Sequence, residues 1–161
     1  MVRIEKSFKT GFAFSLISFV ALNALFSLIV AGLNEDLLID SIPEYLFGAI
    51  IQSPSNSVEQ IFVNTMNLNA ISVLEYVGYI VPPLVASIIA GWFNGGGKKT
   101  AFLSWYLVAV IGSITIYVFK IVLFASGVEA VLSYVFFILV KGLIIGLLYG
   151  AITMLVNPEY Y

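Results

Sequence analysis

Four long apolar runs dominate the sequence, and each is long enough to cross a lipid bilayer. A hydrocarbon core about 30 Å thick requires about 20 predominantly apolar residues in a helix. The run from Thr10 to Leu33 contains no charged residue. The pattern predicts an all-α integral membrane protein, a single domain built as a four-transmembrane-helix bundle. The predicted spans cover residues 10–33, 71–93, 101–125 and 130–156.

Composition supports this fold class and excludes most kinds of catalytic and metal site. Hydrophobic residues make up 61% of the chain and charged residues 10%, whereas soluble domains are roughly 45–50% apolar. The absence of Cys and His excludes disulfides, thiolate or imidazole metal sites and catalytic triads with an imidazole base. We therefore expect no catalytic residues, no cofactor and no metal site. With only 7 basic residues and a net charge of -2, no nucleic-acid partner is expected either.

The placement of basic residues predicts the orientation in the bilayer. Cytoplasmic flanks of membrane spans are enriched in Lys and Arg. Three basic residues precede the first span, and Lys98 and Lys99 follow the second, while residues 34–70 contain five acidic residues and no basic one. The pattern predicts a protein of the cell membrane with both termini cytoplasmic and residues 34–70 extracytoplasmic.

A glycine-rich turn, residues 94–100, joins the second and third predicted spans. It lacks the first glycine and the preceding strand of a phosphate-binding loop, so its lysines are expected to meet anionic lipid headgroups instead. Trp92 and Trp105 flank the turn, where amphipathic rings anchor at a membrane interface. They are predicted to mark the cytoplasmic interface.

The external segment, residues 34–70, is predicted to form short interfacial helices. Pro43 can start one helix, and Ser57 with Gln60 resembles the capping box of another. Two interpretations remain open, a lid packed on the bundle and a docking surface for a partner subunit. The acidic residues at its start are expected to be solvated, although their oxygens could hold a divalent cation weakly: Glu35, Asp36 and Asp40.

Charged residues within predicted spans need a specific explanation, because they are costly in a bilayer. Glu75 and Lys120 both lie near the outer ends of their spans, so an ion pair between them is the simplest reading. A proton or ion relay, and snorkelling of Lys120 to the interface, are the alternatives.

Lys141 lies close to the middle of the fourth span and has no acidic residue in that span. We expect it to find a partner in water, in a neighbouring subunit or in backbone carbonyls. Pro82 and Pro83 are predicted to kink the second span and to free such carbonyls. Lys141 then acts as a structural contact, or as part of a substrate or proton path.

Small residues predict where helices approach closely. Gly142, Gly146 and Gly150 form a doubled GxxxG stripe, and Ser87 with Gly91 offers a small-residue face on the second span. The motif leaves open whether the contacting helix belongs to this chain or to another.

These features favour a non-catalytic subunit that packs against and stabilises a larger membrane complex. The alternative is a homo-oligomeric channel or transporter with a polar path near Glu75, Lys120 and Lys141. The predicted partners are the lipid bilayer and either other integral membrane subunits or copies of the chain itself.

Overall fold

The computed structural model describes residues 5–33, 42–124 and 127–158, which are helical except for short connections. Four helices in these ranges are long and apolar enough to cross a membrane, which confirms the all-α prediction and its four long helices. They are α1 (Phe8–Leu33), α4 (Ala70–Phe93), α5 (Lys98–Phe124) and the helix Val128–Val156, which comprises α6 (Val128–Tyr134), the π-helix η3 (Val135–Val140) and α7 (Lys141–Val156). The shorter elements are α2 (Ile42–Phe47), η2 (Gly48–Ile51) and α3 (Pro54–Met66).

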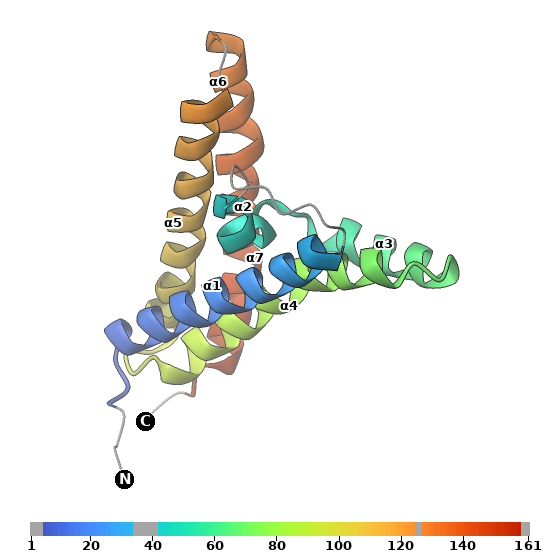
Figure 1. The fold of residues 1–161 in the computed structure, drawn as a ribbon. Coiled ribbons are helices and arrows are strands. Elements are labelled where there is room, and N and C mark those ends of the chain that lie inside the picture. Colours follow the sequence, from blue (N-terminus) through green and yellow to red (C-terminus); the bar gives the residue numbers. More distant parts are fainter. Residues whose placement is uncertain (1–4, 34–41, 125–126, 159–161) are drawn as a thin grey trace.

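The long helices form two pairs that meet at one end and diverge toward the other (Figure 1). In one pair α1 lies along α4, and in the other α5 lies along α7. The start of α1, the turn between α4 and α5, and the end of α7 all lie at the end where the pairs meet (Figure 1). The described part of the chain is therefore an open, V-shaped arrangement of helices.

Amide side chains hold the meeting end together. The Asn157 Nδ2 donates to the carbonyl oxygens of Gly91 and Asn94 at 2.9 and 3.0 Å, which ties the end of α7 to the end of α4. The Asn94 Nδ2 donates to the Ser104 Oγ at 2.7 Å and so reaches α5. Since buried amides that form hydrogen bonds offset their loss of hydration, this network fixes the junction of the two pairs.

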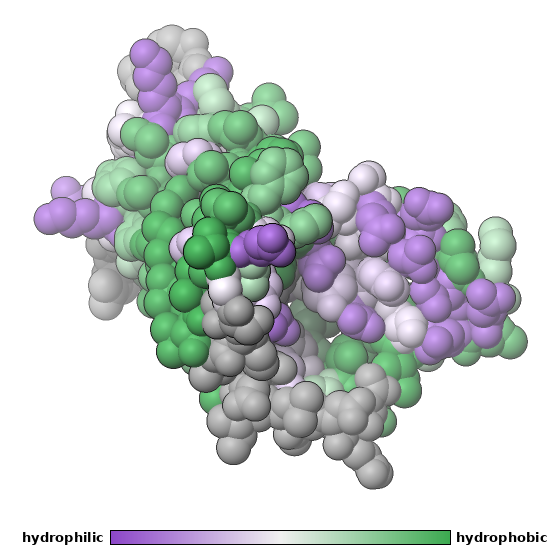
Figure 2. Space-filling model, turned by 90° about the horizontal axis from the view of Figure 1, so that it is seen from above, coloured by the Kyte–Doolittle hydropathy of each residue, from purple (hydrophilic) through white to green (hydrophobic). Residues whose placement is uncertain are grey.

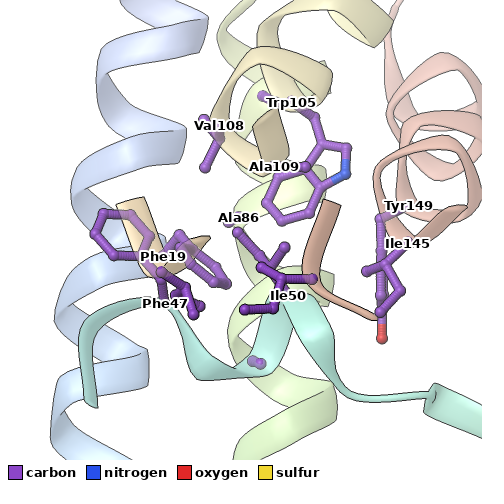
Figure 3. Close-up of a cluster of buried hydrophobic side chains, with 13 residues drawn as sticks. Phe19, Phe47, Ile50, Ala86, Trp105, Val108, Ala109, Ile145 and Tyr149 are labelled. Carbon is purple, nitrogen blue, oxygen red and sulfur yellow. The ribbon is translucent and has the colours of Figure 1, made fainter. Parts of the chain in front are cut away.

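The segment α2–η2 fills the opening between the two pairs, with Phe47, Ala49 and Ile50 buried. Figure 3 shows Phe47 and Ile50 among side chains contributed by the long helices. The predicted short helix is found here, and its burial against the long helices fits the interpretation of a packed lid. Its apolar side chains bury more surface between the helix pairs than they would at an interface.

Trp105 lies at the centre of the apolar core and is fully buried, so its prediction as an interface residue was wrong. Its ring packs edge-on against Phe19 at 5.7 Å and Tyr149 at 5.9 Å, between centroids, and thus joins α1, α5 and α7 (Figure 3). Such edge-to-face packing is favourable for aromatic rings. Trp92, in contrast, is 55% exposed.

Helix α3 lies beside α4 and exposes polar side chains together with the apolar Phe62 and Met66. Figure 2 shows hydrophilic side chains gathered on the arm that carries α3, whereas hydrophobic residues dominate much of the rest of that face. The helix begins at Pro54 after the N-cap Ser53, so the predicted start at Ser57 was wrong. Proline suits the first turn because its φ is already helical and its missing N–H is not needed there.

Candidate functional site

A pocket of about 240 Å³ lies between α1, α2–η2 and the N-terminal half of α4. Its lining residues on the long helices belong to the last part of α1 and the first half of α4. These parts of the two helices lie away from the turn between α4 and α5 (Figure 1). Its polar lining includes two carboxylates, Glu44 and Glu75, and the amide of Gln52. Its apolar and aromatic lining includes Phe26, Val30, Ala31, Tyr45, Ile51 and Tyr79.

Asn23, buried in the middle of α1, positions the α2 side of this pocket. Its Nδ2 donates to the carbonyl oxygens of Glu44 at 3.3 Å and Tyr45 at 2.7 Å, and its Oδ1 accepts from the Ala49 N–H at 3.2 Å. These three groups lie where α2 passes into η2. Some backbone N–H and C=O groups at such a helix end have no hydrogen-bond partner within the helix. Asn23 was missed at the sequence level; the one signal for it is an amide inside an otherwise apolar run.

Lys120 forms an ion pair in this region, but with a different carboxylate from the one predicted. The Lys120 Nζ lies 2.6 Å from the Glu44 Oε1, which connects α2 to the outer end of α5. Glu75 was the expected partner, but its Oε1 accepts a hydrogen bond from the Tyr79 hydroxyl at 2.6 Å. Tyr79 lies four residues after Glu75, one turn along the same helix face, so this bond forms within α4.

The lining of the pocket limits which ligands it can hold. Among the described residues, no group of three metal-ligating side chains comes together. The carboxylate of Glu44 is neutralised by Lys120, whereas the described residues supply no cationic partner for Glu75. The acidic residues Glu35, Asp36 and Asp40, considered above as a weak cation site, lie outside the described residues.

Lys141 does not line the pocket. Its side chain is exposed on the outer side of the α6–α7 helix, and its Nζ lies 5.6 Å from the centroid of the Phe137 ring. Pro82 and Pro83, the suggested source of carbonyl partners for Lys141, are buried in α4, which continues as one helix through both. Lys141 therefore faces the surroundings of the chain.

The small residues lie at contacts between helices of this chain. A Cβ added to Gly146 or Gly150 would contact Tyr106 or Phe102, and one added to Gly142 would collide with Ser113, all on α5. On α4, a Cβ at Gly91 would lie 2.6 Å from the Thr153 carbonyl oxygen of α7. The buried Ser87 Oγ donates to the Leu84 carbonyl oxygen at 2.7 Å, within its own helix.

Comparisons with protein-family models, with curated proteins and with solved structures found no match to this chain. The class of the protein therefore rests on its own fold, which has four helices long and apolar enough to cross a membrane. Its two sites of interest are the pocket with Glu44 and Glu75, and the outward-facing Lys141.

Proposed function

We propose that this chain is a non-catalytic integral membrane subunit that packs against and stabilises a larger complex of different membrane proteins. The observation that carries the proposal is the exposed Lys141 in the middle of the apolar helix Val128–Val156. Lys141 lies 13 residues from Val128 and 15 from Val156, about 20 Å from either end at 1.5 Å per residue. In a hydrocarbon core about 30 Å thick that is centred on this helix, Lys141 lies about 15 Å from either interface, farther than a lysine stem reaches.

An unpartnered lysine at this depth is costly. Insertion measurements give about 2.5–3.5 kcal/mol for a lysine at the centre of a transmembrane helix. The neighbours of Lys141 along the same stripe of the helix are apolar and exposed, so they provide no counter-charge: Phe137, Ile144 and Leu148. We call these four residues the Lys141 face. A carboxylate on an adjacent transmembrane helix would neutralise the charge and cover the apolar residues together.

The acidic residues described in this chain favour a different protein as that partner. Glu44 is paired with Lys120, and Glu75 lines the pocket between α1 and α4. Neither offers a second copy of the chain an outward carboxylate at the depth of Lys141. The other described acidic residues lie away from the middle of the long helices: Glu5 precedes α1, Glu59 lies on α3 and Glu129 lies in the first turn of α6. The homo-oligomeric channel, with one polar path near Glu75, Lys120 and Lys141, is less well supported, because Lys141 does not line the pocket that contains Glu75.

We also propose that the protein lies in the cell membrane with both termini cytoplasmic and residues 34–70 outside. Lys6, Lys9, Lys98 and Lys99 belong to the end where the helix pairs meet, and cytoplasmic flanks favour such residues. The exposed Trp92 ring at this end lies 5.2 Å from the Lys6 Nζ, a pairing suited to a headgroup region.

Site-specific photo-crosslinking in membranes of the organism of origin tests the subunit proposal. A p-benzoylphenylalanine in place of Ile144, on the Lys141 face, is expected to yield an adduct with a different integral membrane protein. Lys141→Met should reduce the yield strongly, while Lys141→Arg, which keeps the charge, should retain most of it. The matched control places the same crosslinker at Leu25, an exposed position of α1.

The same experiment can overturn the proposal. Adducts to lipid alone at Ile144, or a yield that ignores Lys141→Met, would contradict a carboxylate-bearing partner helix. Adducts between two copies of this chain would instead favour the homo-oligomer, and measurements of solute flux would then follow.

A further inference from the structure

The pocket between α1, α2–η2 and α4 contains one carboxylate, that of Glu75, that forms no ion pair with the described residues. Lys120 neutralises Glu44 at 2.6 Å. Glu75 shares its Oε1 with the Tyr79 hydroxyl, and its Oε2 accepts no hydrogen bond from the described residues. A ligand with a single positive charge would pair with the Glu75 carboxylate, since a charge in a partly desolvated site is stable only when it is paired.

Two backbone carbonyls beside Glu75 also lack their helical donors. Proline has no N–H, so Pro82 and Pro83 cannot donate to the carbonyl oxygens of Gly78 and Tyr79 four residues earlier. Both Gly78 and Tyr79 line the pocket, and Gly78 can do so only with backbone atoms because it has no side chain. The prolines thus leave acceptors without helical donors in the turn of α4 that lines the pocket.

The remaining walls and the size of the pocket indicate an organic ligand. Its 240 Å³ is about eight times the volume of a water molecule in the liquid, far more than a bare metal ion fills. Phe26, Val30 and Ile51 supply apolar walls, and the rings of Phe26 and Tyr79 can face a cation.

We propose that this pocket binds a primary ammonium ion that carries a small apolar tail. The ammonium pairs with the Glu75 carboxylate, the Gly78 carbonyl offers a further acceptor in the same wall of the pocket, and the tail fills the apolar part. The inference goes beyond the proposed subunit role and does not rest on the Lys141 face.

Calorimetric titration of the full chain in lipid nanodiscs, with empty nanodiscs subtracted, tests this assignment. The probe is n-butylammonium. Two matched compounds separate its properties: 1-butanol keeps the tail without the charge, and tetramethylammonium keeps the charge without N–H donors. We expect n-butylammonium to bind at least about tenfold more tightly than either, as hydrogen bonds between charged groups imply.

Four variants locate the binding. Glu75→Gln keeps an acceptor for Tyr79 but removes the charge, and should weaken n-butylammonium binding about tenfold or more. Pro82→Ala restores a helical donor to the Gly78 carbonyl and should weaken binding several-fold. Gly48→Leu should abolish binding, because Gly48 lines the pocket and a Cβ there comes no nearer than 3.9 Å to the Glu44 Cβ, so the larger side chain is expected to take up pocket volume. Gly32→Leu, at a position with nothing within 4 Å of the added Cβ, is the control and should bind normally.

Three results would overturn the inference. One is n-butylammonium that binds no more tightly than 1-butanol to the unmodified protein. The other is binding that survives both Glu75→Gln and Gly48→Leu, because the ligand would then lie elsewhere. The third is tetramethylammonium that binds as well as n-butylammonium, because the N–H donors would then contribute nothing and the primary-ammonium proposal would fail.

Discussion

At the residue scale, Asn23 fixes where the chain between the first two long helices lies. One buried amide serves three backbone groups at the α2–η2 boundary, and no other polar group of α1 reaches that boundary through a hydrogen bond in the described structure. The apolar contacts of Phe47 and Ile50 follow from that placement, because they bring η2 between the helix pairs. A single polar residue in an apolar helix therefore helps to place the side chains that α2–η2 contributes to the core.

We predict that Asn23→Ala destabilises the protein by about 2–4 kcal/mol, because it leaves buried backbone groups without partners. The measurement is thermal unfolding in detergent, followed by circular dichroism. Ser18→Ala is the control, since the Ser18 hydroxyl bonds only to backbone carbonyls of its own helix, those of Phe14 and Ser15. Equal melting temperatures for the two variants would contradict the role assigned to Asn23.

At the scale of elements, the packing between the long helices depends on glycines, which have no side chain. Gly91 lets α4 approach the backbone of α7, and the glycines of α7 let that helix approach α5. Close backbone approach replaces hydrophobic burial as a source of helix association where lipid surrounds the helices. The two kinds of contact differ, because Gly91 opposes a rigid carbonyl, whereas Gly150 opposes the ring of Phe102.

Gly91→Ala is accordingly expected to destabilise the fold by about 1–3 kcal/mol, since the added methyl group must displace the α7 backbone. Gly32→Ala, in α1, is the matched control, because an added Cβ there meets nothing within 4 Å. It should be neutral or slightly stabilising, as alanine favours a helix over glycine. Unfolding by denaturant measures both, and a neutral Gly91→Ala would show that α4 and α7 do not pack as described.

At the scale of the whole molecule, the V shape rests on a junction at one end and a plug in the opening. The junction is the network of Asn94 and Asn157, and the plug is α2–η2, held by Asn23 and by the Glu44–Lys120 ion pair. Loss of the junction should let the two helix pairs pivot about the plug.

We therefore predict that Asn157→Ala broadens the distribution of distances between the two arms. The chain contains no Cys, so spin labels can be placed on Leu33→Cys and Val122→Cys, at exposed positions near the outer ends of α1 and α5. Pulsed electron paramagnetic resonance then reports the distance distribution. Asn64→Ala, on α3, should leave it unchanged, and an equally narrow distribution for Asn157→Ala would contradict a role for Asn157 in the junction.

The pocket and the Lys141 face differ in how far the sequence could predict them. The sequence predicts that Lys141 is unusual, because a charge in the middle of an apolar run is a local feature. The sequence does not predict the pocket, because the residues that line it come from three separate elements. Glu75 was noticed, but Glu44 lay in a segment interpreted as an external loop, and nothing in the sequence connects it to Lys120, 76 residues later.

The sequence by itself determined the four long helices and their approximate ends, because length and apolarity are local properties that a bilayer selects. It also determined which positions are small enough for close helix contact. Only the tertiary structure decided the partner of Lys120, the burial of Trp105 and the position of α2–η2. Each of these depends on which helices become neighbours, and that choice is made by packing between residues far apart in the chain, for which a single apolar periodicity carries no signal.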